Sequence, residues 1–185
     1  MKLFYQQTNG LLIESEYFKD DLDAPAHFML HACDNLFFTN QKLNGLPDKR
    51  FIRFAENEDE AIYLLDMENL SPSGVPLILL NIPTQNFCVP LTNSFDILLE
   101  SACIGLLGII EQIIVNEEPN IPSLPSKILK KKSGILPCLK DFFVVAKREY
   151  ELLDIWHISV KAKKMVQESL ENWFQIIKTL LAKFD

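Results

Sequence analysis

One polar segment, ENEDE at residues 56–60, holds the closest group of carboxylates in this sequence of 185 residues. Carboxylates between two apolar stretches suggest either a calcium loop or an acid–base pair. A calcium loop that begins at Glu56 needs glycine at its sixth position and glutamate at its twelfth, but these positions hold Ala61 and Met67. A catalytic carboxylate needs a desolvating pocket that raises its pKa, and the tip of a hairpin provides none. We therefore interpret ENEDE as a solvated hairpin tip.

The charge of this tip predicts a contact surface for another macromolecule. Clustered charge attracts a partner of opposite sign and raises the association rate more than the affinity. Residues 1–118 contain eighteen Asp and Glu against six Lys and Arg, a formal charge of −12, which favours a basic protein partner and disfavours nucleic acid. We predict that the partner contacts four side chains of the tip, Glu56, Glu58, Asp59 and Glu60.

Histidine and cysteine offer a second group of candidate ligands. His27 and His31 would share a face on a helix or on a strand, with Cys33 close behind. Zinc requires three or four ligands at defined spacing, which this group does not supply. The third histidine, His157, lies far along the chain, and the sequence has no GxSxG, P-loop or GxGxxG motif. We therefore expect no catalytic residue, no metal site and no cofactor, and a protein that is not an enzyme.

The remaining cysteines and the apolar segments indicate the compartment. The chain has no CxxC pair, so we expect buried free thiols in a reducing, cytoplasmic environment at Cys33, Cys88, Cys103 and Cys138. The N-terminal sequence MKLFYQQTNG meets polar residues too soon for a secretory signal. Residues 97–115 approach the length of a membrane span, but Glu100 and Glu111 interrupt them, so we expect a buried helix and no membrane span.

The elements that must position these residues begin as an antiparallel meander. Asn-Gly pairs at residues 9–10 and 44–45 mark turns, and short connections at residues 56–60 and 83–86 join two strand pairs. β-Branched and aromatic content predicts strands at Leu11–Ile13, in two short runs within Phe28–Phe38, and at Phe51–Ala55, Ala61–Asp66, Val75–Ile82 and Phe87–Leu91.

Helical periodicity begins only after these strands. Apolar residues recur at three- and four-residue steps from Phe95 to Ile113, which predicts one helix with its N-cap among residues 92–94. Prolines then interrupt the chain, and further helices are expected at Leu139–Leu153 and along the apolar stripe of Val166–Phe184. We predict a domain at residues 1–118, a Pro- and Lys-rich linker at 119–137 and a helical region at 138–185 docked on that domain.

Three segments in succession resemble the SMI1/KNR4 (SUKH) superfamily. FYQQTNG is similar to the family's tyrosine and Asn-Gly beside the first strand, and FIRFAENEDEAIYLLDM resembles its acidic turn followed by tyrosine and leucine-aspartate. VPLILLNIPTQNFCVPLTNSFDILLE is similar to the closing part, in which a strand pair precedes serine-phenylalanine and a helix. The order and spacing agree over about residues 1–115, whereas the C-terminal third has no counterpart in the family.

The resemblance implies an α+β fold with a largely antiparallel central sheet and flanking helices, to which this chain adds a C-terminal helical extension. It also implies a protein-binding function, because bacterial members are often immunity proteins that neutralise toxins and fungal members are regulatory scaffolds. The family has a helix before the tyrosine element, so either this helix is lost here or the terminal helices cover the sheet instead. Three functions are weighed: an immunity protein against a basic toxin, an adaptor that binds through its C-terminal helices, and a hydrolase, which would need a pocket of converging polar groups.

Overall fold

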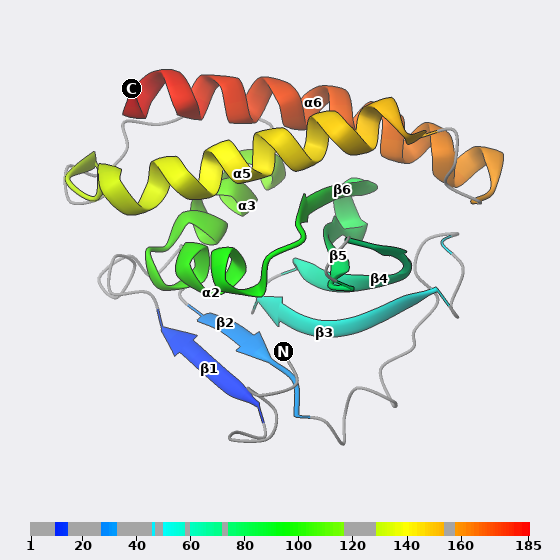
Figure 1. Cartoon of the computed structure of the whole chain (residues 1–185), viewed down its shortest axis with the longest axis horizontal. Coiled ribbons are helices and arrows are strands. Elements are labelled where there is room, and N and C mark those ends of the chain that lie inside the picture. Colours follow the sequence, from blue (N-terminus) through cyan, green and yellow to red (C-terminus); the bar gives the residue numbers. More distant parts are fainter. Residues whose placement is uncertain are drawn as a thin grey trace.

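The sheet and helices of this protein form an α+β fold. The structure, a computed structural model, describes residues 10–14, 27–32, 46, 50–57, 60–71, 74–116, 129–153 and 158–185. The described strands form one antiparallel sheet in the order of the sequence, β1 to β6, as the meander prediction requires (Figure 1). Their bounds are Leu11–Glu14 (β1), His27–Leu30 (β2), Phe51–Asn57 (β3), Ile62–Leu70 (β4), Pro76–Ile82 (β5) and Phe87–Thr92 (β6).

The register of the sheet sets which side chains share a face. Directly opposed residues of antiparallel strands point to the same side. Leu12 pairs with Met29, Met29 pairs with Glu56, and Glu56 pairs with Ile62, so these four side chains cross the sheet in one row. The pairing of β3 with β4 shifts between Arg53 and Ala55, which is a bulge.

Two short helices follow β6 where the sequence predicts a single long one. They are α2, at Phe95–Cys103, and α3, at Leu106–Val115. The predicted start is confirmed, because the Ser94 hydroxyl accepts a hydrogen bond of 3.3 Å from the backbone N–H of Ile97. The prediction of one continuous helix is wrong, because the chain bends by 80° at Gly105. Gly105 has φ of 76°, a conformation that side-chain-bearing residues rarely adopt and that ends a right-handed helix.

The two terminal helices are longer than the sequence suggests. Helix α5 spans Lys132–Glu151 and α6 spans Val160–Phe184. The first begins seven residues before the expected Leu139, so the last part of the predicted linker, residues 132–137, is helical. Pro137 lies near the start of α5, where its missing N–H removes one backbone hydrogen bond from the early turns.

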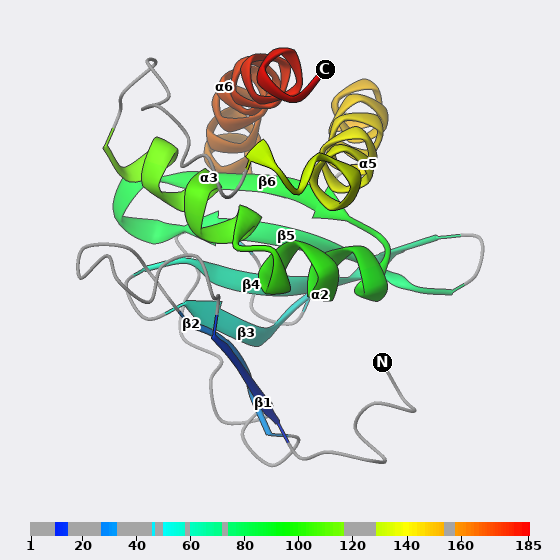
Figure 2. The same ribbon diagram turned by 90° about the vertical axis from the view of Figure 1, so that its left-hand side faces the viewer.

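The terminal helices cover one edge of the sheet. Both α5 and α6 contact β6 and each other, and α2 contacts α3, α5, β6 and β1. Figure 2 shows α5 and α6 lying over β6, while α2 and α3 cross one face of the sheet. The buried apolar residues of the described strands and of α2, α3, α5 and α6 belong to one hydrophobic cluster.

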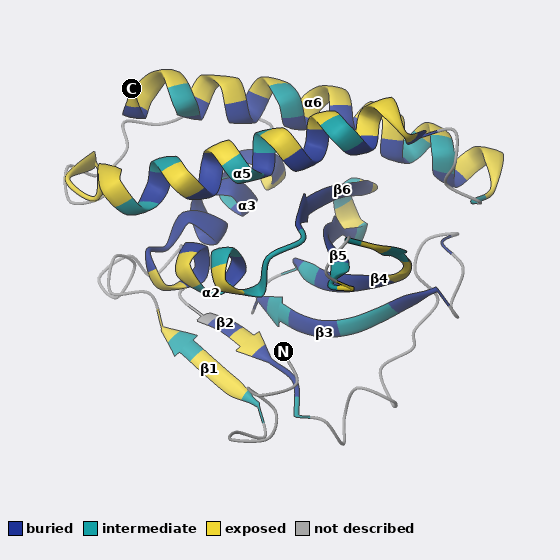
Figure 3. Ribbon diagram, in the orientation of Figure 1, coloured by how far each residue is buried: buried dark blue, intermediate teal, exposed yellow. Residues whose placement is uncertain are grey.

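Burial falls from one edge of the sheet to the other. All six residues of β6 are buried, and so are all residues of β5 after Pro76. Strand β1 has only one residue of intermediate burial, and the other three are exposed. Figure 3 shows this gradient from dark blue at β6 to yellow at β1. In the part of the chain that the structure describes, no single helix combines the length and apolarity of a bilayer span, although α2 and α3 together reach them across their bend.

Candidate functional site

The ENEDE segment does not lie wholly in a turn. Glu56 and Asn57 are the last residues of β3, and Asn57 closes the hairpin by donating its backbone N–H to the carbonyl of Ala61 at 2.9 Å. Glu60 is of intermediate exposure, whereas Glu58 and Asp59 lie outside the described residues. The prediction of a solvated tip is therefore wrong for Asn57, which is only 7% exposed. The predicted role of the four acidic residues as a partner site stays a prediction.

Asn57 has an internal partner on α3. Its side-chain amide donates a hydrogen bond to Glu111, and the same carboxylate accepts the backbone N–H of Ala61 at 3.2 Å. Glu111 is 2% exposed, and a buried carboxylate requires such donors. Burial and the nearby Glu111 carboxylate raise the pKa of Tyr63 well above its ordinary value. These contacts fix the end of the hairpin to α3 rather than form a site that a ligand could enter.

The sequence prediction missed this buried carboxylate. In the sequence Glu111 indicates only a charge that interrupts an apolar helix, and Asn57 is part of an acidic turn. One signal was available, because a single acid inside an otherwise apolar stripe must find donors if the stripe is covered on most sides. The identity of those donors depends on a contact across 54 positions of the chain, which local pattern does not reveal.

The row across β1 to β4 is the more accessible feature of the sheet. Leu12 is 54% exposed and its neighbour Met29 is 39% exposed. The Glu56 side chain is 20% exposed and borders Met29, and Ile62 at the end of the row is of intermediate burial. We call Leu12, Met29 and Glu56 the open-edge row. It places two exposed apolar side chains beside a carboxylate at the end of the sheet that α5 and α6 do not cover.

Two polar side chains, Arg53 and His31, lie against the Glu56 carboxylate. This carboxylate forms an ion pair with the Arg53 guanidinium and lies 3.6 Å from His31 Nε2. Burial, and secondarily the positive charge of Arg53, lower the pKa of His31 below 6.5, and burial also lowers the pKa of Arg53. Glu56 alone would favour a charged imidazole, but its carboxylate is already shared with Arg53, so we expect neutral His31 at pH 7. Among the described residues, neither His31 Nε2 nor Arg53 Nε, both buried, has a hydrogen-bond partner.

The candidate ligands for a metal do not converge in the described part of the chain. No group of three His, Cys, Asp or Glu suited to a metal ion occurs among the described residues. The side chain of His27, and all of Cys33 and His157, lie outside those residues, so the expected absence of a metal stays a prediction.

The thiols differ from one another in exposure. Cys88 and Cys138 are buried and unpaired, as predicted, and burial raises the pKa of each thiol to about 12. Cys103, at the end of α2, is exposed, which corrects the prediction for that residue. A thiol with so high a pKa carries almost no thiolate at neutral pH, so the two buried cysteines are poor nucleophiles.

The described charges separate into an acidic and a basic region. From residue 10 to 116 the described residues include eight Asp and Glu but only two Arg, and both arginines form ion pairs, with Asp66 and Glu56. The described residues of 129–185 include eleven Lys and Arg against six Asp and Glu. The sheet with α2 and α3 is thus acidic, and the pair α5 and α6 is basic.

Comparisons of the chain with protein-family models, with characterised proteins and with solved structures find no match. The resemblance to the SMI1/KNR4 superfamily therefore stays a prediction, carried by the residues quoted for it.

Proposed function

We propose that this protein is a non-enzymatic binding module of SMI1/KNR4 type that neutralises a basic protein toxin by covering its surface. The observation that carries the proposal is the open-edge row, in which exposed Leu12 and Met29 adjoin Glu56. Protein interfaces commonly combine an apolar centre with a polar rim, and Met is among the residues enriched there. Exposed apolar side chains at the last described strand of a sheet favour aggregation unless a binding partner covers them. Their presence here therefore supports an interface.

The acidic residues of the sheet region indicate that the partner is positively charged. The sheet region carries an excess of carboxylates, and its two described arginines are already paired with carboxylates. A basic partner would be steered to this surface, which raises the association rate by a salt-sensitive factor, while the apolar contacts slow dissociation. Neutralisation then requires no covalent bond to be made or broken. The bound chain covers the functional surface of the toxin and blocks it by steric and electrostatic occlusion.

The experiment screens basic protein toxins of the native host for binding to the wild-type chain and measures the growth of cells that express a bound toxin. Wild-type chain should restore growth, and Leu12→Arg should abolish rescue because it places a cation in the proposed interface. Val144→Arg is the matched control, since Val144 is an exposed apolar residue, 63% accessible, on α5. Equal rescue by both variants, or failure of the wild-type chain to bind any such toxin, would refute the proposal.

An adaptor that binds through its helices is the second candidate. Val144 and Tyr150 on α5 are exposed apolar side chains and favour this candidate. The rings of Tyr150 and Phe143 pack against that of Phe174 on α6, with centroid separations of 5.8 and 5.6 Å. Deleting the helices would not isolate this role, because they also bury β6. The two variants above separate the candidates instead: loss of binding with Val144→Arg and retention with Leu12→Arg would assign the contact to the helices.

A further inference from the structure

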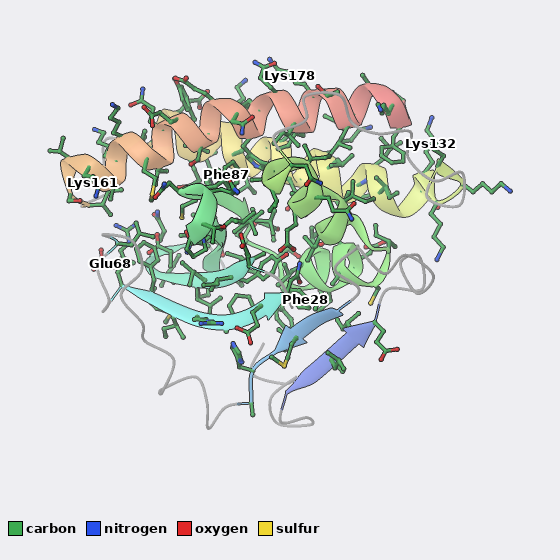
Figure 4. The ribbon with its side chains drawn as sticks, turned by 180° about the vertical axis from the view of Figure 1, so that it is seen from behind. Phe28, Glu68, Phe87, Lys132, Lys161 and Lys178 are labelled. Carbon is green, nitrogen blue, oxygen red and sulfur yellow. The ribbon has the colours of Figure 1, made fainter. Side chains whose placement is uncertain are left out.

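A groove of about 650 Å³ runs between α6 and the connection from β5 to β6. One wall is a stripe of α6 that includes Lys161, Lys164 and Asn172, and the other comprises residues 85–87. Figure 4 shows Lys161 in the helical layer, and Phe87 lies nearer that layer than Phe28 on β2. None of the residues that line the groove belongs to the open-edge row. The groove is therefore distinct from the open-edge row, and the inference drawn from it does not rest on the proposed function.

The sequence builds both walls and joins them. Groove residues of α6 recur at steps of three and four from 161 to 172, which places them on one face of the helix. The opposite wall follows the 3₁₀ turn η2 at Pro83–Gln85, where Asn86 takes φ of 50° and redirects the chain into β6. The buried Ser169 hydroxyl accepts the backbone N–H of Cys88 at 3.2 Å and donates to the carbonyl of Met165 at 2.8 Å. The helix and the turn are thus held in a fixed relation.

The groove presents cations beside groups that bind peptide backbone. Lys161 is exposed and has no ion pair or hydrogen bond in the described part of the chain. Among the described residues, the Lys164 ammonium pairs with the Glu168 carboxylate alone, at 3.6 Å. The two side chains are 77% and 66% exposed, so a competing carboxylate can displace this weak ion pair. Gln85, Asn86 and Asn172 each carry an amide that can both donate and accept hydrogen bonds.

We propose that this groove binds an acidic peptide segment of another protein in an extended conformation. The stripe from Lys161 to Asn172 spans about 16 Å along the helix, which matches about five extended residues. Carboxylates of the peptide would pair with Lys161 and Lys164, its backbone would meet the amides, and an apolar side chain would lie over Met165. A lone inorganic anion would use the lysines but leave the amides and most of the groove unfilled. The basic character of the helical region favours an acidic ligand here although the whole chain carries a net charge of −7.

The test selects linear hexapeptides from a random displayed library on the immobilised full chain. We expect selected sequences to be enriched in Asp and Glu. A synthetic selected peptide should lose about tenfold or more in affinity for K161E/K164E, as expected for removing close charge pairs. The matched control is K140E/K178E, which makes the same charge change at exposed lysines of α5 and α6 outside the groove. This variant should bind within about twofold of wild type.

Four outcomes would overturn the proposal. The first is selection without acidic enrichment, and the second is an equal loss of affinity in the two double variants, which would indicate net charge rather than the groove. The third is displacement of the peptide by an equal concentration of inorganic phosphate, which would indicate a simple anion site. The fourth is self-association of wild-type chain, measured by sedimentation, that K161E/K164E abolishes, because the occupant would then be a second copy. Unfolding curves for both variants confirm that each is folded before binding is compared.

Discussion

The two ends of the sheet differ in what covers them rather than in strand pairing. At one end, β6 pairs with β5 and lies under α5 and α6, so all of its residues are buried. At the other, β1 pairs with β2 in the same antiparallel manner, yet Leu12 remains 54% exposed. Both strands are rich in apolar residues, and so apolar content alone does not determine burial. The comparison suggests that the β6 end carries stability, whereas the β1 end is free to carry function.

The largest loss of stability is expected from a substitution where α5 and α6 pack on β6. Trp173 on α6 is fully buried, and its ring lies 6.4 Å from that of Phe87 on β6 and 6.2 Å from that of Phe142 on α5, centroid to centroid. Trp173→Ala should lower the free energy of unfolding by about 3–5 kcal/mol, because it leaves a cavity between helix and sheet. Chemical denaturation measures this loss. A loss of the size expected for a surface residue would show that α5 and α6 are appended to the sheet without stabilising it.

The next largest effect is expected in the middle of the sheet, at the buried ion pair. Asp66 is 0% exposed and accepts hydrogen bonds from Arg50 Nε at 2.7 Å and from Arg50 Nη2 at 2.6 Å. Asp66→Ala should lower the free energy of unfolding by up to about 5 kcal/mol, since it leaves the buried Arg50 guanidinium without this counter-charge. The double variant Arg50→Ala/Asp66→Ala should be less destabilised than the sum of the two single variants. Additive losses in denaturation would show that the pair is not coupled.

Local chemistry accounts for the parts of the fold that were predicted. The alternation of turn residues with β-branched and aromatic runs predicted each of the six described strands, whereas the second apolar run expected within Phe28–Phe38 lies outside the described residues. Ser94 marked the start of α2 because its hydroxyl caps the helix. Apolar periodicity continues across Gly105 and therefore concealed the bend, since periodicity reports burial and not the axis of a helix. Pro137 and the preceding lysines likewise suggested a linker, because a proline inside a helix removes a backbone hydrogen bond and crowds the preceding turn. Helix α5 nevertheless accommodates Pro137 near its start.

The candidate site was harder to predict because it depends on pairing between distant segments. The open-edge row combines one residue from each of three strands, and no local pattern places Leu12 beside Met29 or Met29 beside Glu56. The acidic segment attracted attention through its composition, but composition does not distinguish Glu56, which faces Arg53, from Asn57, which faces Glu111. The groove is similarly absent from the sequence pattern, since its two walls lie about eighty positions apart, as the contact of Ser169 with Cys88 illustrates.

Substitution of His31, near the open edge, should change the free energy of unfolding by a smaller amount, and only at acidic pH. Its pKa is lowered in the folded state, so below about pH 6.5 the unfolded chain binds a proton that the folded chain does not. The contribution of His31 to the free energy of unfolding is therefore fully present above the pKa that His31 has in the unfolded chain. This contribution is lost as the pH falls through the lower pKa of His31 in the folded chain. His31→Asn should flatten the decline of unfolding free energy between about pH 7 and pH 5. Parallel profiles of wild type and variant, measured by urea denaturation, would contradict a lowered pKa.

The smallest effect is expected at the open edge itself. Leu12→Ala should change the free energy of unfolding by about 0.5 kcal/mol or less, because a half-exposed side chain at the last described strand loses little packing. The same substitution at the other edge, Leu91→Ala in the fully buried β6, should cost about 2–5 kcal/mol. Measuring both by the same denaturant titration tests the comparison with residue type held constant. If Leu12→Ala were as destabilising as Leu91→Ala, the leucine would belong to the core, and its exposure would no longer need a partner to explain it.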